Sequence, residues 1–366
     1  MLINNKPYHT IWTKQDNNEI VQIIDQRKLP FEVSIVDLIS IDDVFYAIKD
    51  MLVRGAPLIG VAASYGMYLG VLKEKSELSD SKIIEFAKFL KSARPTAVNL
   101  EYAVDLVVKN IIKLKTKEAK IDVAFKLAKQ LKEKEILASK RIGENGVKII
   151  EELFIKKNKK TINILTHCNA GWLACIDYGT ATAPIYKAKE IGIDIHVWVD
   201  ETRPRNQGAR LTAWELEQNN IPYTIISDNT GGLLMQKDMV DVVVVGSDRT
   251  TISGDVANKI GTYLKALAAY DNNVPFYVAL PTSTIDKNIS DGKEIPIEER
   301  NSDEVKYIEG LYKNKITKVL ITPPKSRALN FGFDVTPAKY VTALITDKGI
   351  CKANKSDITK TLAKDD

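Results

Sequence analysis

Cysteine and histidine are scarce in this chain of 366 residues, and their scarcity limits its possible chemistry. The three cysteines form no Cys-x-x-Cys pair, and the three histidines form neither a His-x-His nor a His-Glu-x-x-His pattern. Structural zinc sites are typically built from such pairs, and small secreted domains use denser sets of cysteines as disulfide frameworks. We therefore expect no bound metal, no disulfide framework and a reducing, cytoplasmic environment.

Three further features are missing, and each excludes a class of function. No apolar run approaches the length that spans a membrane, and the segment Met1–Pro7 lacks the apolar core of a signal peptide. The glycines match neither a Walker loop nor a G-x-G-x-x-G fingerprint, so we expect no nucleotide cofactor. The formal net charge is only +5, and the basic segment Lys156–Lys160 contains no aromatic residue. We therefore expect neither a membrane nor a nucleic acid as partner.

The hydrophobic pattern changes along the chain, which predicts two domains. Short β-branched runs at Glu19–Ile24 and Phe31–Val36 predict a small antiparallel sheet. From Ile41 to about Lys156, apolar residues recur three and four positions apart, which predicts a helical layer. We place the boundary at the basic segment, so that residues 1–156 form a helical domain preceded by the small sheet.

Residues 157–366 alternate between short apolar runs and helical patterns. Six strands are predicted, which are Ile162–Leu165, Ile193–Val199, Tyr223–Ile226, Val242–Val245, Phe276–Leu280 and Lys318–Thr322. Such alternation is typical of parallel sheets, so the predicted fold class is α/β, with a C-terminal Rossmann-like parallel sheet flanked by helices. The segment Lys352–Asp366 is expected to be a loosely held polar tail.

Asp248, which follows the four valines Val242–Val245, is the most informative candidate for chemistry. A strand of valines is buried on both faces, as in a parallel sheet, and ligands collect outside the carboxyl ends of such strands. An aspartate in this position is equally well explained as a turn former or helix cap. Evidence from other segments of the chain is needed to distinguish the two interpretations.

A second candidate is Cys168, which follows the first predicted strand in the segment Thr166–Gly171. A thiol in a loop of small residues ahead of a helix is a setting for a reactive thiolate, although a buried, inert cysteine is the usual alternative. Neighbouring strand residues point to opposite faces, so we expect no direct pair between His167 and Cys168. Cys175, about two helical turns further on, is expected to be a small buried hydrophobe.

Two arginines precede predicted helix starts, and both are candidates for binding an anion. The segment Arg54–Pro57 places proline in the first turn of a helix, where free backbone amides bind anions, and Arg94–Thr96 repeats this arrangement. Together with Lys259, they suggest a small phosphate monoester held by charge-assisted hydrogen bonds. The polar loop Asp200–Arg210 is expected to direct two or three further side chains at a ligand.

Five segments resemble the family of S-methyl-5-thioribose-1-phosphate isomerases, and the match runs in order through nearly the whole chain. These segments are Arg54–Pro57, Arg94–Thr96, His167–Gly171, Glu201–Pro204 with Gln207–Leu216, and Gly254–Thr262. The family is related to regulatory subunits of the guanine-nucleotide exchange factor for translation initiation factor two. The resemblance implies that Cys168 together with Asp248 separates the isomerases from these non-catalytic relatives.

The resemblance implies an aldose–ketose isomerase of methionine salvage, which acts as a homodimer without cofactor or metal. Its substrate, methylthioribose 1-phosphate, is locked as a closed acetal, so an acid must assist ring opening, and apolar surroundings would raise the pKa of Asp248 for this task. Cys168 would stabilise the following hydrogen transfer or act as its base, and hydride and proton transfer both stay open. The residues implied to bind substrate are Arg54, Gly55, Ala56 and Arg94 for the phosphate, and Gln207, Asn258 and Lys259 for hydroxyls or phosphate.

Two departures from the family pattern leave alternatives open. Bulky Trp172 stands where a small or aliphatic residue is expected, and the loop with Arg205 and Asn206 is more polar than the leucine-bearing form of the family. A changed pocket could prefer 5-deoxyribose 1-phosphate or ribose 1,5-bisphosphate, whereas core packing beneath the loop is the favoured explanation of Trp172. The third alternative is a non-catalytic regulatory subunit that senses sugar phosphates or nucleotides.

Overall fold

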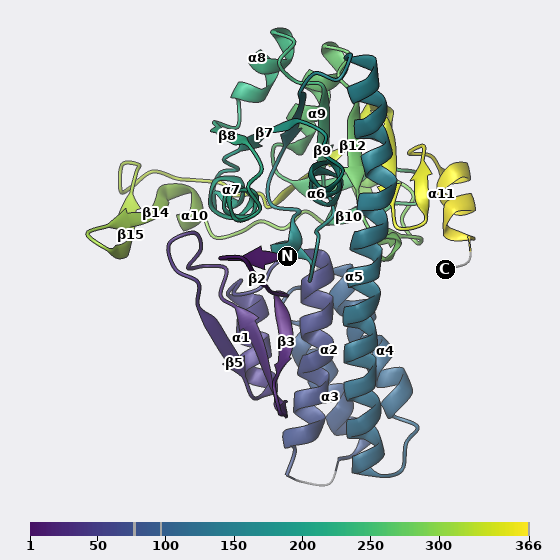
Figure 1. Ribbon diagram of the computed structural model, residues 1–366. Helices are drawn as coiled ribbons and strands as arrows, with labels where there is room; N and C mark the ends of the chain where they lie inside the picture. The colour runs from purple at the N-terminus through teal and green to yellow at the C-terminus, as the bar shows by residue number, and fades with distance from the viewer. Residues whose placement is uncertain (76–77, 96, 365–366) are drawn as a thin grey trace.

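The structure of the chain, a computed structural model, describes residues 1–75, 78–95 and 97–364. A helical N-terminal part lies at one end and a part built on a sheet lies at the other, and one long helix runs along both (Figure 1). The predicted fold class is confirmed, since a small antiparallel sheet and a helical layer precede a mostly parallel sheet with flanking helices. Thr96 of the quoted motifs lies outside the described residues.

Short antiparallel sheets open the chain. Their strands are β1 (Leu2–Ile3) paired with β2 (Lys6–Pro7), and β3 (Ile11–Lys14), β4 (Asn17–Ile24) and β5 (Ile35–Leu38) in a second sheet. The prediction of a strand over Phe31–Val36 was partly wrong, because β5 begins only at Ile35. Phe31 and Glu32 instead donate backbone hydrogen bonds to the Lys28 carbonyl, which closes a turn there.

The helical layer is arranged around its second helix. Its helices are α1 (Ile41–Lys49), α2 (Ala56–Lys73), α3 (Asp80–Lys91), α4 (Val98–Ile111) and α5 (Lys117–Lys156). All residues of α2 from Ala56 to Val71 are buried, because small or apolar residues cover it on every side. This burial holds the N-terminus of α2 in a constant position below the sheet.

A seven-stranded sheet forms the centre of the C-terminal part, in the order β18-β17-β12-β9-β6-β7-β8. Its strands are β6 (Ile162–Thr166), β7 (Ile195–Asp200), β8 (Tyr223–Ile226), β9 (Val242–Val245), β12 (Phe276–Ala279), β17 (Ala343–Thr346) and β18 (Gly349–Cys351). Only β17 and β18 pair antiparallel among these strands. The helices beside the sheet are α6 (Ala183–Glu190), α7 (Ala213–Gln218), α8 (Thr230–Gln236) and α9 (Thr262–Asp271). Five of the six predicted strands lie in this sheet.

The direction in which strands are added changes between β6 and β9. From β6 the chain adds β7 and β8 on one side, and β9 then pairs with the other side of β6. In open α/β sheets, a ligand crevice forms at the carboxyl ends of strands that flank such a switch point. Cys168 follows β6 and Asp248 follows β9, so the strand order brings them to the same crevice.

A smaller sheet continues from Asp248. Its order is β13 (Ile285–Asp286), β10 (Arg249–Thr251), β11 (Val256–Lys259) and β16 (Phe333–Thr336). The amide of Asp248 donates to the carbonyl of Ala257 over 3.0 Å. Because β11 folds back on β10, Asn258 and Lys259 return to the level of Asp248.

The prediction of a sheet strand at Lys318–Thr322 was wrong. This stretch falls on β15 (Lys315–Leu320), which pairs with β14 (Tyr307–Tyr312) in a hairpin that projects from the body (Figure 1). The two residues between the strands, Lys313 and Asn314, have φ angles of 47° and 59°. A two-residue turn with both residues left-handed joins adjacent antiparallel strands, so the hairpin pairs with itself.

The expectation of a loose polar tail was also wrong. Residues 355–362 form helix α11 (Lys355–Leu362), and Asn354 caps it by accepting from the amide of Asp357 over 2.9 Å. Ile358 of this helix is fully buried in a core cluster of the C-terminal part. The N-cap and the packing of Ile358 and the partly buried Leu362 therefore dock a helix whose other residues are polar.

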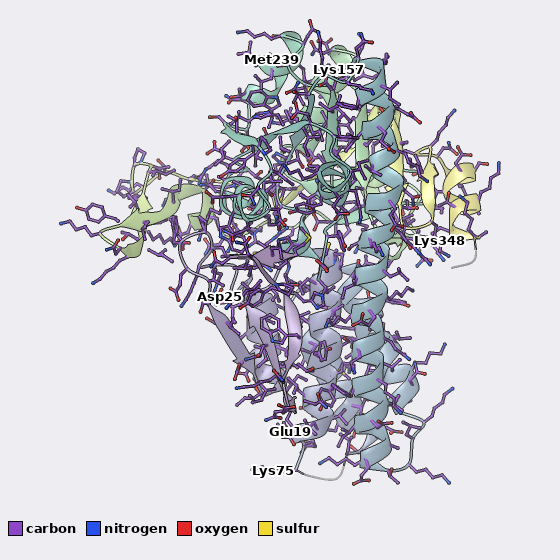
Figure 2. The ribbon with its side chains drawn as sticks, in the orientation of Figure 1. Glu19, Asp25, Lys75, Lys157, Met239 and Lys348 are labelled. Carbon is purple, nitrogen blue, oxygen red and sulfur yellow. The ribbon has the colours of Figure 1, made fainter. Side chains whose placement is uncertain are left out.

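Helix α5 connects the two parts of the molecule. Its first half packs on α2, and its second half packs on α6, where Gly143 and Gly146 face Ala183 and Pro184. Figure 2 shows Lys157, which follows α5, at the end of the molecule opposite Glu19 and Lys75. The domain boundary at residue 156 stays a prediction. In the described ranges, no helix combines the length and the apolarity that crossing a membrane requires.

Candidate active site

A pocket with an empty volume of about 400 Å³ lies at the carboxyl ends of β6 and β9. A second pocket of about 530 Å³ adjoins it and shares Gly55, Ala56 and Asp248. Together the two pockets collect most of the predicted site residues, which are Arg54, Gly55, Ala56, Arg94, Cys168, Asp248 and Asn258. The structure thus brings together side chains from both parts of the molecule.

The N-terminus of α2 forms one wall of these pockets. Gly55 precedes the helix with φ of 95°, and a Cβ atom there would lie 2.3 Å from the carbonyl oxygen of Ala174. Only glycine fits this close approach, which seats the helix end against the loop after β6. No residue of this first turn carries an acidic side chain, and the first amides of a helix have no acceptor within the helix, so they are a candidate site for an anion.

Arg54 ties this helix start to the loop after β6. Its Nη1 donates to Asn169 Oδ1 over 2.6 Å, and its Nη2 donates to the Asn169 carbonyl over 2.9 Å. The same Nη2 lies 4.0 Å from the sulfur of Cys168. The guanidinium group therefore stands between the anion site and the thiol.

A buried carboxylate, Glu215 of α7, holds the loop that carries Cys168. It accepts from Asn169 Nδ2 at 2.9 Å, from the amides of Trp172 and Leu173 at 3.1 and 2.9 Å, and from the Tyr186 hydroxyl at 2.9 Å. Burial raises the pKa of Glu215, and these hydrogen bonds oppose that rise. Sequence analysis missed this role, although a lone carboxylate in the apolar run Ala213–Leu216 was a signal for it.

Cys168 itself is held through its backbone. Its amide donates to Thr202 Oγ1 over 2.8 Å, and its carbonyl accepts from Thr212 Oγ1 over 2.7 Å. These bonds support a φ of 67°, which is uncommon for a residue with a side chain. The thiol is therefore placed by its own loop, by Thr202 and by Thr212 of the helical segment Gly208–Thr212.

His167 does not pair with Cys168, as predicted. Its Nδ1 lies 2.8 Å from Asp200 Oδ2, and its Nε2 lies 2.8 Å from the Ile260 carbonyl oxygen. A carbonyl oxygen only accepts, so Nε2 carries the hydrogen of this bond. The imidazole thereby links the strand end of β7 to the segment that carries Lys259.

The same histidine belongs to a cluster of His167, Asp200 and Asp228, whose ligand atoms lie within 4.8 Å of one another. The ammonium group of Lys265 lies 3.1 Å from Asp200 Oδ2 and already supplies a cation there. Asp228 accepts from the amides of Thr202 and Arg203 over 2.6 and 2.7 Å. The cluster thus fits a structural polar network better than a metal centre, and the expectation of no metal stays a prediction.

Asp248 lines both pockets, and burial and the neighbouring charges have opposite effects on the pKa of its carboxyl group. Burial raises the pKa of its carboxyl group, whereas the charges of Lys259, Arg54 and Arg94 lower it. The rise prevails, so the protonated form persists to a higher pH than in water. This is the direction that an acid catalyst requires.

Lys259 approaches the same centre from β11. Its Nζ donates to the Gly332 carbonyl over 2.7 Å and lies 4.7 Å from the centroid of the Phe333 ring. Burial lowers the pKa of Lys259, whereas its electrostatic interactions with Cys168 and Asp248 raise it. The ammonium group of Lys259 is therefore near enough to interact with both of these side chains.

Gln207 is placed differently from the other predicted site residues. It lines a separate small pocket with Arg54, Arg205 and Arg210, whereas Cys168 lines the central pocket, and Arg54 lines both. Its Oε1 is buried without a hydrogen-bond partner among the described residues. The structure thus brings Gln207 near the site without placing it in the pocket with Asp248.

Trp172, one of the two departures from the family pattern, and Cys175, which was expected to be a small buried hydrophobe, are both core residues. Trp172 is fully buried, and its ring centroid lies 6.1 Å from that of Trp214. Cys175 is buried as well, and burial raises the pKa of its thiol. The interpretation of both as packing residues is confirmed.

Comparison with known proteins assigns the family. Residues 52–353 match the Initiation factor 2 subunit family. The methylthioribose-1-phosphate isomerase of Desulfatibacillum aliphaticivorans is 54% identical, with 98% of each chain covered. The enzyme of that name from Escherichia coli O45:K1 (strain S88 / ExPEC) is 50% identical, with 99% of this chain and 97% of the relative covered.

Two solved structures have the same fold over nearly all of this chain. The 5-methylthioribose 1-phosphate isomerase from Pyrococcus horikoshii OT3 has a TM-score of 0.83 and 35% identity, covering 98% of this chain and 96% of that one. The translation initiation factor eIF-2B, subunit delta, from A. fulgidus has a TM-score of 0.79 and 34% identity, covering 98% and 100%.

The fold and the site therefore define an α/β enzyme of the isomerase class, with its pocket at the switch point of a parallel sheet. The chain belongs to the Initiation factor 2 subunit family and, within it, groups with the methylthioribose-1-phosphate isomerases. The resemblance inferred from the sequence motifs is confirmed.

We predict that Glu215→Gln lowers the free energy of unfolding by about 2 kcal/mol, because an amide NH₂ group would face hydrogen-bond donors in a buried site. Chemical denaturation measures this change. Glu217→Gln, on the exposed side of the same helix, is the matched control and should leave the stability unchanged. Equal stabilities of the two variants would contradict the proposed role of Glu215.

Proposed function

We propose that this chain converts S-methyl-5-thioribose 1-phosphate into S-methyl-5-thioribulose 1-phosphate, an aldose–ketose isomerisation in methionine salvage. The observation that carries the proposal is the meeting of Asp248 and Cys168 in one pocket, beside arginines and a helix N-terminus. Relatives that match over the full length and bear this enzyme's name support it.

The cationic side of the pockets is the proposed phosphate site. Arg54 and Arg94 would donate charge-assisted hydrogen bonds to the phosphate, and the amides of Gly55 and Ala56 would add the helix N-terminus. Lys259 would balance the remaining charge. Binding in this way fixes the sugar against the reactive groups, which supplies much of the rate enhancement.

Asp248 is proposed to open the ring. Its carboxyl group would give a proton to the ring oxygen while the bond between that oxygen and the first carbon breaks. The hydrogen on the second carbon then moves to the first, as a hydride or as a proton, and the second hydroxyl loses its proton as the ketone forms. The Asp248 carboxylate would accept that proton and so return to its acid form, and Cys168 would stabilise or assist the hydrogen transfer.

The wall of the second pocket favours an apolar group on the fifth carbon. Ile59, Ala97, Phe333 and the segment Ile295–Ile297 line it next to Arg94 and Asp248. A methylthio group would bury apolar surface there, whereas a second phosphate would have to compete with Asp286 for Arg249, the further cation that lines this pocket. This lining favours methylthioribose 1-phosphate over ribose 1,5-bisphosphate.

A substrate panel tests the function. We expect the purified protein, with no added cofactor, to give a kcat/KM for methylthioribose 1-phosphate about ten-fold above 5-deoxyribose 1-phosphate, which lacks the buried methylthio group. The value for ribose 1,5-bisphosphate should be lower still. Folded protein that turns over none of the sugars, or that prefers another of them, would contradict the proposal.

The acid role of Asp248 has its own test. We expect Asp248→Asn to lower kcat by at least about 100-fold while inorganic phosphate still binds, because only proton donation is lost. In the unmodified protein, kcat/KM should fall as pH rises through the raised pKa of Asp248. Asp238→Asn, an exposed residue of the turn after α8, is the control and should keep full activity. A fully active Asp248→Asn variant would sink this assignment.

We further propose that the chain forms a homodimer. Its projecting hairpin exposes Leu311, Tyr312 and Val319, an apolar set that a second copy would cover. Sedimentation equilibrium should then give twice the chain mass of 40.9 kDa, and the mass of one chain would refute the dimer.

The cytoplasm is the proposed compartment, because free thiols such as those of the described cysteines persist there. Cell fractionation would test this proposal.

A further inference from the structure

A carboxylate lies on the cationic side of the pockets, and the proposed chemistry does not use it. Glu298 Oε2 is 3.4 Å from Arg94 Nη2, and Glu298 Oε1 is 3.4 Å from Arg300 Nη1. Glu298 follows Ile297, which lines the pocket with Arg94 and Asp248. The carboxylate thus stands between two guanidinium groups at the edge of the proposed phosphate site.

The two contacts of Glu298 are loose for ion pairs of this kind. Charge-assisted hydrogen bonds between arginine and a carboxylate are about 2.7 to 2.9 Å long. The hydrogen bonds of Arg300 to Glu304 are much shorter, since its Nε and Nη2 donate to that carboxylate over 2.9 and 2.6 Å. Arg300 is therefore anchored by Glu304, and its contact with Glu298 is the weaker of the two.

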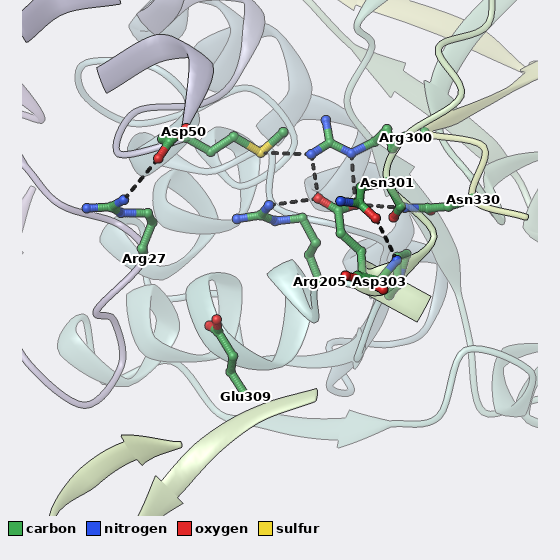
Figure 3. A network of polar contacts seen from close by, with 12 residues as sticks. Arg27, Asp50, Arg205, Arg300, Asn301, Asp303, Glu309 and Asn330 are labelled. Atoms are coloured by element: carbon green, nitrogen blue, oxygen red, sulfur yellow. Dashed lines mark hydrogen bonds and ion pairs between the residues drawn. The ribbon is translucent and has the colours of Figure 1, made fainter. Parts of the chain in front are cut away.

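The anchor of Arg300 is a network that does not involve the pocket. Glu304 also accepts from Arg205 Nη1 over 2.9 Å and from Asn330 Nδ2 over 2.8 Å (Figure 3). Although burial opposes it, the hydrogen bonds and charges of Arg300 and Arg205 lower the pKa of Glu304 to about 2. This network keeps Arg300 in place whatever group faces its Nη1, the nitrogen that now contacts Glu298.

Arg94 is less well satisfied than Arg300. Its side chain is only 14% exposed, and its Nε is buried with no hydrogen-bond partner in the part of the chain that the structure describes. A phosphate monoester carries more charge and more acceptor oxygens than a carboxylate, so it would satisfy these donors better than Glu298 does.

We propose that Glu298 competes with the substrate phosphate for Arg94 and Arg300, so that Arg300 is a further phosphate-positioning residue and Glu298 sets the phosphate affinity. This inference rests on the proposed phosphate site. The dianion displaces the looser carboxylate when substrate binds, and Glu298 regains the guanidinium groups when product leaves. Without this competition, substrate and transition state would both bind more tightly. Such uniform binding lowers KM without raising kcat, and the competition limits it.

Glu298 also acts on the proposed acid. The groups that influence Asp248 are Lys259, Arg54 and Arg94, which lower its pKa, and Glu298, which raises it. Loss of the Glu298 charge therefore shifts the pKa of Asp248 downward. The acid form is then lost at a lower pH, so the alkaline limb of kcat/KM moves to lower pH.

The test is a titration with inorganic phosphate, measured by calorimetry on the full chain. Glu298→Gln should bind phosphate about five-fold more tightly than the unmodified protein, because the competing charge is gone while the side chain keeps its size. Glu299→Gln is the matched control: it removes the same charge from the next residue, which is exposed, and should change the dissociation constant less than two-fold.

A second variant covers the case in which Glu298→Gln does not fold. Glu298→Asp keeps the charge but is too short to reach both arginines, so its phosphate affinity should lie between those of the unmodified protein and Glu298→Gln. Phosphate affinity that is unchanged or weaker in the folded Glu298 variants, relative to Glu299→Gln, would overturn the proposal. Because phosphate binding needs no turnover, a failure of the proposed isomerase activity would show separately, as absent conversion by the unmodified protein.

Discussion

The hydrogen bonds accepted by buried Glu215 are the interaction on which the candidate site depends. They give the loop after β6 one shape, and that loop presents Cys168 to the pocket and Asn169 to Arg54. Arg54 in turn connects the loop to the start of α2, whose burial among the other helices fixes the anion site. One carboxylate thereby couples the position of the thiol to that of the proposed phosphate site.

The balance of charge in the pocket imposes the second constraint. A phosphate dianion requires cations, but cations favour the ionised form of Asp248 and so oppose its use as an acid. Burial resolves this conflict in the protein, since it raises the pKa of Asp248 in spite of Lys259, Arg54 and Arg94. Glu298 works in the same direction, and it also occupies an arginine that the phosphate needs. Phosphate affinity and the acidity of Asp248 are therefore linked through one side chain.

Much of the fold could be predicted from local patterns, and the errors have physical reasons. The strand at Val242–Val245 and the helices of the N-terminal part were predictable because continuous apolar runs and helical periodicity are local properties. Lys318–Thr322 was misassigned because a short apolar run such as Val319–Ile321 predicts a strand but does not distinguish a hairpin from a larger sheet. The helix over residues 355–362 was missed because only two apolar residues, Ile358 and Leu362, mark its buried side.

The sequence by itself determined which groups are available: a carboxylate after a valine strand, a thiol in a loop of small residues, and arginines at two helix starts. These follow from covalent order and local conformation. Only the tertiary structure decided which of them meet, because Glu215 and its loop partner Asn169 are 46 residues apart and Arg54 and Asn169 are 115 apart. It likewise placed Gln207 outside the central pocket and Glu298 beside Arg94, since contacts between distant segments depend on strand order and packing rather than on neighbours in the chain.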